Sequence, residues 1–105
     1  MALPPLTAEQ RVAALEKGAR IRAERADIKR LLKQGTRTLP DVLKDAANSD
    51  AIAGIKVLAL VESMPGVGKV RAKQITERLG IAESRRVRGL GSNQRAALVG
   101  EFAAA

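Results

Sequence analysis

The apolar side chains of this chain are almost all aliphatic, and their spacing is typical of helices. The sequence contains one aromatic residue, Phe102, and its other large apolar residues are Leu, Ile, Val and two Met. No stretch alternates Val, Ile or Thr with polar residues, as a half-buried strand would. Alanine, leucine and arginine, which favour helices, are abundant. We therefore predict an all-α fold, with a long N-terminal helix arm followed by a compact helical domain.

The composition also excludes several classes of function. The 105 residues include neither cysteine nor histidine, which removes thiol chemistry, histidine acid–base catalysis and the usual ligands of structural zinc. We expect no metal and no other cofactor. No apolar stretch approaches the roughly 20 residues of a membrane span, and the N-terminal Met-Ala-Leu-Pro-Pro lacks the pattern of a signal peptide. A cytoplasmic location away from membranes is therefore expected.

A strong and uneven positive charge points to a polyanionic partner. The net charge is +8, with 12 arginines, whose planar fork suits phosphate, and 7 lysines. The charge balance is +5 in residues 1–37, −2 in residues 38–64 and +5 in residues 65–105. We therefore divide the chain into a basic N-terminal helix or arm (1–37) and a compact helical domain (38–105) that begins with core segments.

The first basic segment is predicted to form one helix over residues 8–33. Thr7 opens a capping-box pattern, and Gly35 follows the expected end. Val12 lies on one side of such a helix and Ile28 nearly opposite, so no single apolar stripe covers its length. We expect the second half to pack on the domain and the first half to project. Acidic residues are interleaved with the basic ones, so a merely solvated helix face remains an alternative.

The most specific segment is the turn Pro65-Gly66-Val67-Gly68-Lys69, expected between two helices. Its glycines allow the backbone to approach a ligand, and the first N–H groups of the next helix, with the lysine, form an anion site. A nucleotide P-loop would require glycine at position 63 and Ser or Thr after the lysine, whereas the sequence has Ser63 and Val70 at these positions. The segment therefore predicts phosphate binding, with a plain helix–helix turn as the alternative.

A second basic motif places three arginines within four residues. Arg85, Arg86 and Arg88 surround Val87, and Gly89 closes the motif. Such a density of charge is self-repulsive unless an anion neutralises it. We expect the valine to point inward and the arginines outward. A basic loop that serves only solubility remains the alternative.

These motifs together resemble the helix–two-turns–helix module. The resemblance is carried by Pro-Gly-Val-Gly-Lys-Val-Arg-Ala, then Ile-Thr-Glu-Arg-Leu-Gly-Ile, then the Arg-Arg-Val-Arg-Gly-Leu-Gly loop. With its Leu-Pro-Pro-Leu-Thr start and long basic helix, the whole chain resembles the actinobacterial (mycobacterial and streptomycete-type) integration host factor family. The resemblance implies a nucleoid-associated monomer that binds and bends double-stranded DNA largely independently of sequence. It also implies effects on compaction, supercoiling and phage site-specific recombination, with phage integrase as a candidate partner.

The same resemblance assigns residues to the DNA contacts. The principal DNA-binding residues are expected to be Pro65, Gly66, Val67, Gly68, Lys69, Arg71, Arg85, Arg86, Arg88 and Gly89. A second DNA surface on the N-terminal helix would use Arg20, Arg22, Arg25, Lys29 and Lys33. Pro65 or Val67 at the tip of the turn could wedge between base steps and kink the duplex.

Other proteins with this module leave one open alternative. DNA repair glycosylases need a catalytic N-terminal proline or acid and a cysteine zinc finger, whereas Pro4 follows three residues here and no cysteine is present. We therefore expect no catalytic residues and no enzyme. A ribosome-associated or other structured-RNA-binding protein remains the alternative. Binding to anionic membranes is disfavoured because the N-terminal helix lacks a broad, bulky apolar face.

Overall fold

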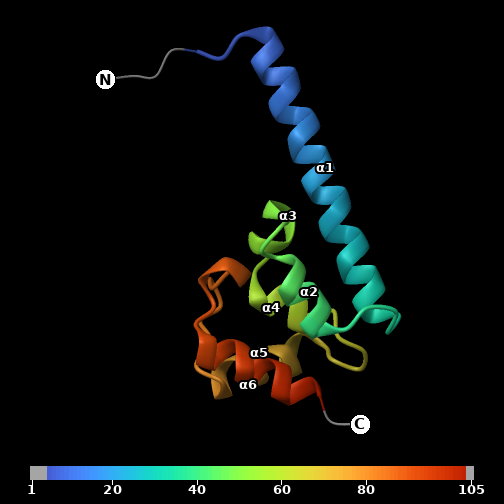
Figure 1. Ribbon diagram of the computed structural model, residues 1–105, viewed down its shortest axis with the longest axis vertical. Helices are drawn as coiled ribbons and strands as arrows, with labels where there is room; N and C mark the ends of the chain where they lie inside the picture. The colour runs from blue at the N-terminus through green and yellow to red at the C-terminus, as the bar shows by residue number, and fades with distance from the viewer. Residues whose placement is uncertain (1–4, 104–105) are drawn as a thin grey trace.

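The computed structural model describes residues 5–103, and the regular secondary structure in that range is helical. The elements are α1 (Ala8–Lys33), α2 (Leu39–Asp45), α3 (Asp50–Ala53), α4 (Val57–Glu62), α5 (Lys69–Arg78), the short 3-10 helix η1 (Val87–Gly89) and α6 (Ser92–Phe102). The predicted all-α fold is confirmed (Figure 1). Pro4, which entered the comparison with glycosylases, lies outside the described residues. Of the described helices, none combines the length and hydrophobicity that a membrane span requires.

α1 begins and ends where the sequence predicts, because both ends carry local capping signals. The Thr7 hydroxyl oxygen accepts from the Gln10 N–H at 3.0 Å, and the Gln10 side chain accepts from the Thr7 N–H at 2.9 Å. Together these bonds form the capping box. At the other end Gly35 has φ 73°. Its N–H and that of Thr36 donate to carbonyls in the last turn of α1, as in a Schellman motif.

The two halves of α1 have different surroundings. Ile28 and Leu32 are 5% and 0% exposed and belong to the core, whereas Val12 and Leu15 are 54% and 69% exposed. The N-terminal half accordingly extends beyond the domain (Figure 1). The predicted projection of one half and packing of the other are confirmed. A domain boundary after residue 37 stays a prediction, and two core residues precede it.

A single hydrophobic core joins the C-terminal half of α1 to α2, α4, α5 and α6. Leu39, Leu60 and Leu98 are among its fully buried side chains, and Phe102 packs at its edge. α5 ends at a Schellman motif with Gly80 at φ 72°. The core thereby fixes both ends of the loops 63–68 and 79–86, which together with the adjoining α5 and η1 carry the predicted site.

α3 was not predicted from the sequence. Ser49 caps α3, because its hydroxyl oxygen accepts from the Ile52 N–H at 3.3 Å. The same hydroxyl donates to the Glu24 carboxylate of α1 at 2.7 Å. α3 packs against α1 and connects the long helix to the rest of the domain.

Candidate nucleic-acid interface

The turn between α4 and α5 presents its backbone and a lysine at the surface. Gly66 has φ 74°, and Gly68 is the N-cap of α5. Pro65, Gly66, Gly68 and Lys69 are all exposed. α5 begins without a side-chain cap, so no cap occupies the N–H groups of its first turn. The positive end of the helix dipole and the lysine charge therefore fall at the same place, as anion binding requires.

Val67 does not have the predicted role. Its side chain is 7% exposed and belongs to the core, and its N–H donates to the Met64 carbonyl at 3.1 Å. The prediction that Val67 could part a base step is wrong, because the side chain would have to leave the core to do so. Pro65 remains exposed at the turn. Val70, in the first turn of α5, is 73% exposed and is a second apolar side chain at this surface.

The arginine loop, residues 85–89, is held against the segment that precedes α4. The Val57 N–H donates to the Arg85 carbonyl and the Val87 N–H donates to the Ile55 carbonyl, both at 2.9 Å. These two bonds form a short antiparallel pairing. Val87 is fully buried, as predicted, so the loop is fixed to the core at its centre.

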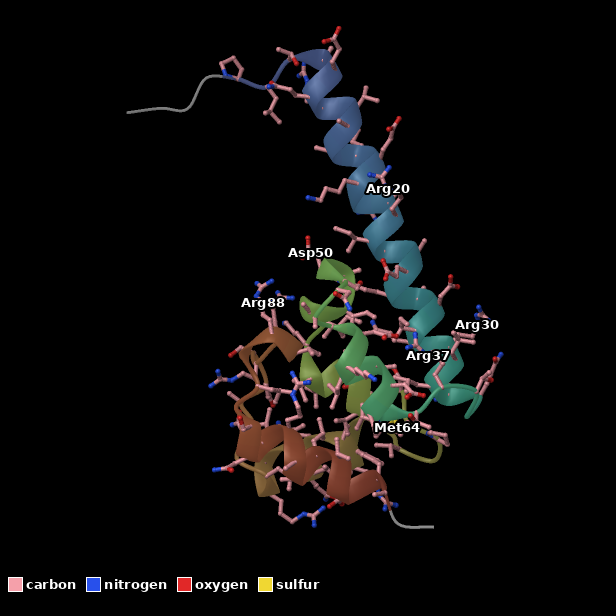
Figure 2. All side chains as sticks on the ribbon, in the orientation of Figure 1. Arg20, Arg30, Arg37, Asp50, Met64 and Arg88 are labelled. Atoms are coloured by element: carbon pink, nitrogen blue, oxygen red, sulfur yellow. The ribbon has the colours of Figure 1, made fainter. Side chains whose placement is uncertain are left out.

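The three arginines of this loop have different partners. Arg86 is half-buried and donates to the Gly54 carbonyl. Arg85 is exposed, and its Nη1 donates to the Gly89 carbonyl within the loop at 2.9 Å. Arg88 is exposed, makes no hydrogen bond or ion pair to the part of the chain that the structure describes, and projects from the domain (Figure 2). Arg88 is therefore the most accessible of the three to an external anion.

The basic residues of α5 are similarly divided. Lys73 pairs with Glu83 at 3.3 Å, and Arg78 pairs with Glu101 of α6. Arg71 is exposed and takes part in no ion pair within residues 5–103. It lies in the first turn of α5 with Lys69. These two cations lie beside the uncapped end of the helix.

Arg25, predicted to belong to a second DNA surface, is engaged with α3. Its Nε donates to the Ala51 carbonyl at 2.9 Å. Its guanidinium also lies beside Gly54, where a Cβ would be 2.5 Å from Nη2. Arg25 is half-buried and its Nε is engaged by the protein, so a contact between Arg25 and DNA stays a prediction.

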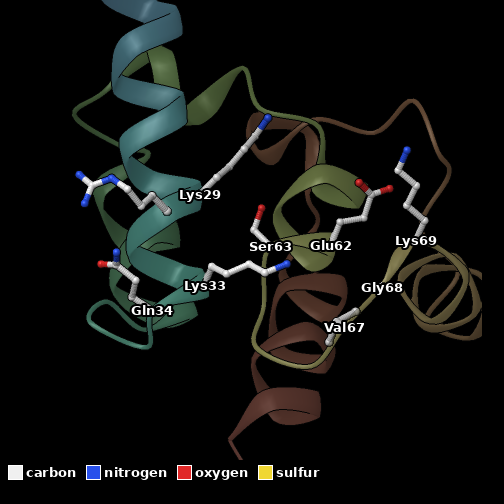
Figure 3. Close-up of a pocket in the computed structure, with 9 residues that line it drawn as sticks. Lys29, Lys33, Gln34, Glu62, Ser63, Val67, Gly68 and Lys69 are labelled. Atoms are coloured by element: carbon white, nitrogen blue, oxygen red, sulfur yellow. The ribbon is translucent and has the colours of Figure 1, made fainter.

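The other four residues of that predicted surface fall into two groups. Arg20 and Arg22 are exposed on the arm, above the contact with α3. Lys29 and Lys33 line a hollow of about 540 Å³ between α1 and the turn, with Lys69 on its other wall (Figure 3). The structure thus brings Lys29 and Lys33 to the principal predicted site and leaves Arg20 and Arg22 apart from it.

The family is decided by comparison with known proteins. Residues 32–102 match the S13-like H2TH domain. The chain is 65% identical over 102 residues to the integration host factor of Streptomyces coelicolor, which is 97% of this chain and 95% of that protein. It is 52% identical to the integration host factor of Mycobacterium tuberculosis over 100% of both chains. This chain belongs to the integration host factor family.

The likeness to the integration host factor family extends to a solved structure. That structure is of sIHF bound to an 8bp palindromic DNA, and it superposes with a TM-score of 0.81 at 61% sequence identity. The match covers 83% of this chain and 98% of that one. The resemblance inferred from the sequence motifs is therefore confirmed.

Three residues of this chain have structural positions that were not recognised in the sequence. Ser49 and Gly54 lie at the two ends of α3, a helix too short for its apolar period to be visible. Their partners, Glu24 and Arg25, are more than twenty residues away. Val70 was visible as an apolar residue outside the buried stripe of α5, and its exposure marks it as a candidate for contact with a ligand.

Proposed function

We propose that this chain is a nucleoid-associated protein that binds double-stranded DNA largely independently of sequence and bends it. The observation that carries the proposal is the 61% identity and TM-score of 0.81 to sIHF, which was solved bound to DNA. The proposal includes effects on DNA compaction, supercoiling and phage site-specific recombination, with phage integrase on attachment-site DNA as a candidate partner. The chain acts as a monomer at the nucleoid, in the cytoplasm, without a cofactor.

Phosphate binding is assigned to the exposed donors around the start of α5 and the arginine loop. Lys69, Arg71 and the N–H groups of the first turn of α5 are accessible at one end of the domain. Arg88 supplies a further cation from η1, and Arg85 and Gly89 supply the adjacent backbone and side chain. Contacts of this kind fix the position of a protein on a duplex without reading its sequence, which explains the low sequence preference.

Bending is assigned to the apolar residues that accompany these donors. Pro65 is exposed at the turn and has no N–H to donate, and Val70 is exposed beside Lys69. Architectural proteins insert small apolar side chains between base steps in the minor groove and so kink the duplex. The deformation costs a few kcal/mol, which additional phosphate contacts offset.

The chain is assigned as a binding protein and not as an enzyme. Its named relatives are integration host factors, and the roles that the proposal assigns to its residues are phosphate binding and DNA deformation. No step of the proposed function requires a bond to be made or broken. Substrate turnover is therefore not part of the proposal.

The test is a comparison of affinity for three polyanions under one salt condition. Fluorescence anisotropy with end-labelled duplex DNA, single-stranded DNA and a structured RNA would give the three dissociation constants. We expect the duplex to bind most tightly, since aromatic side chains for stacking on single strands are limited to Phe102. Tighter binding to RNA would instead support the ribosome-associated alternative.

A further inference from the structure

The hollow between α1 and the turn collects lysines from both predicted DNA surfaces. Lys29 and Lys33 lie one turn apart on α1 and extend into it, Lys69 stands on the other wall, and Glu62 lies between them (Figure 3). None of these four side chains takes part in an ion pair within the described range. Arg30, which also lines the hollow, is paired with Asp27 at 3.2 Å. The hollow therefore has a positive charge that the protein does not neutralise.

The size of the hollow limits which anion can enter it. Its volume of about 540 Å³ equals that of a cube roughly 8 Å on each side, whereas the major groove of B-DNA alone is about 12 Å wide. A whole duplex cannot enter, but the phosphates of one strand can. A phosphate inside the hollow faces lysines from both walls, so it neutralises α1 and the turn together.

We propose that this hollow is a phosphate groove, through which one strand of a bound duplex passes from the turn to α1. The inference rests on the proposed duplex binding and deepens it. Lys29 and Lys33 contact the same duplex as Lys69, through charge-assisted hydrogen bonds from their ammonium groups. The C-terminal half of α1 then continues the surface of the turn and does not hold a separate duplex. Glu62 opposes the phosphate by like-charge repulsion.

The first test compares two double variants that lose the same charge. The groove variant combines Lys29→Ala and Lys33→Ala, which removes both lysines from one wall of the groove. The control variant combines Lys17→Ala and Lys44→Ala, which removes two exposed lysines elsewhere. Each lost phosphate contact lowers the steepness of log K against log salt by about 0.9 on duplex DNA. We expect this steepness to fall by about 1.8 for the groove variant and by little for the control. Equal slopes in the two variants would overturn the proposal.

A second test uses the carboxylate of the groove, where the substitution strengthens binding. Glu62→Gln removes the repulsion, and Glu77→Gln makes the same charge change at an exposed position on α5. Removing a unit charge about 4 Å from a phosphate in water tightens binding about fivefold. We expect a gain of that size for Glu62→Gln and a clearly smaller one for Glu77→Gln. Equal gains would show that no phosphate enters the groove.

Two controls distinguish loss of the groove contacts from loss of the fold and from a failure of the wild-type chain to bind duplex DNA. Thermal unfolding followed by far-UV circular dichroism shows whether each variant retains its fold. If the double groove variant is unfolded, the exposed Lys33→Gln alone is compared with Lys44→Gln, with an expected slope difference of about 0.9. A wild-type chain that fails to bind duplex contradicts the proposed function. A wild-type chain that binds, with an unchanged slope for the groove variant, overturns the groove alone.

Discussion

The guanidinium of Arg25 occupies the space beside Gly54 that a Cβ would fill. Nη2 is 2.5 Å from the position of that Cβ, and Nε donates to the Ala51 carbonyl at 2.9 Å. Arg86 donates to the Gly54 carbonyl from the arginine loop. Two arginines from distant parts of the chain therefore satisfy carbonyls at the C-terminal end of α3, where no helical partner is available. The same arginines connect the long helix to the loop that carries Arg88.

Gly54→Ala should destabilise the fold through Arg25. The added methyl group displaces the flexible end of the guanidinium, weakens its bond to Ala51 and comes within 3.3 Å of the Asp50 carbonyl, so we expect a loss of about 0.5–1.5 kcal/mol in the free energy of unfolding. Urea unfolding followed by far-UV circular dichroism measures this loss. Gly100→Ala is the matched control, because its Cβ would meet nothing within 4 Å and alanine favours the helix. Equal stabilities for the two variants would show that Arg25 is not held at this position.

Arg86 and Arg88 should respond differently to truncation, although they are two residues apart. Arg86→Ala leaves the Gly54 carbonyl without its charged donor and should lower the free energy of unfolding by about 1–3 kcal/mol. Arg88→Ala should leave stability unchanged and weaken duplex binding by about 1–2 kcal/mol. Unfolding curves and anisotropy on the same two variants would show the separation. If both variants lost affinity with unchanged stability, the bond to Gly54 would be dispensable.

Pro65→Ala and Lys69→Ala are expected to separate bending from affinity. Pro65→Ala removes the exposed wedge and should lower the bend while most of the affinity remains. Lys69→Ala removes a phosphate contact and should lower affinity while the residual complex stays bent. Energy transfer between the ends of a labelled duplex reports the bend, and anisotropy reports affinity. A proportional loss of both quantities in both variants would favour bending by asymmetric phosphate neutralisation.

The affinity of the wild-type chain should fall steeply with salt. Contacts from Lys69, Arg71, Arg88 and neighbouring cations to about five to eight phosphates predict a slope of log K against log salt of roughly −4 to −7. Titrations at four or more salt concentrations measure this slope. A slope near zero would mean that the exposed cations do not contact phosphate.

Both ends of α1 and the C-terminal end of α5 were predictable from the sequence because their signals are local. Thr7, with its partner three residues later, and the glycines at positions 35 and 80 need no knowledge of the fold. The positions of Arg25 and Arg86 were not predictable, because their acceptors belong to α3, which is distant in sequence from Arg25 and from Arg86. A run of basic residues in the sequence shows where positive charge lies. It does not show which of these side chains will form hydrogen bonds within the protein.

Val67 shows a related limit of predicting side-chain burial from the sequence. Helical spacing identifies buried residues within a helix, but Val67 lies in a turn, where no period assigns its side chain to one face. Its burial depends on how α4 and α5 meet in the core. Val70 shows the converse, since the period of α5 places it away from the core and it is exposed.

The continuous helix of α1 makes the arm a lever. Its fulcrum is the contact with α3, where the Ser49 hydroxyl donates to the Glu24 carboxylate and the Arg25 Nε donates to the Ala51 carbonyl. From there to residue 8 the helix extends for about 24 Å at 1.5 Å per residue. A tilt of about 10° at the fulcrum therefore displaces the tip by roughly 4 Å. The side chains at α3 thus set the position of the tip near residue 8, whereas Arg20, about 6 Å from the fulcrum along the helix, would move by only about 1 Å.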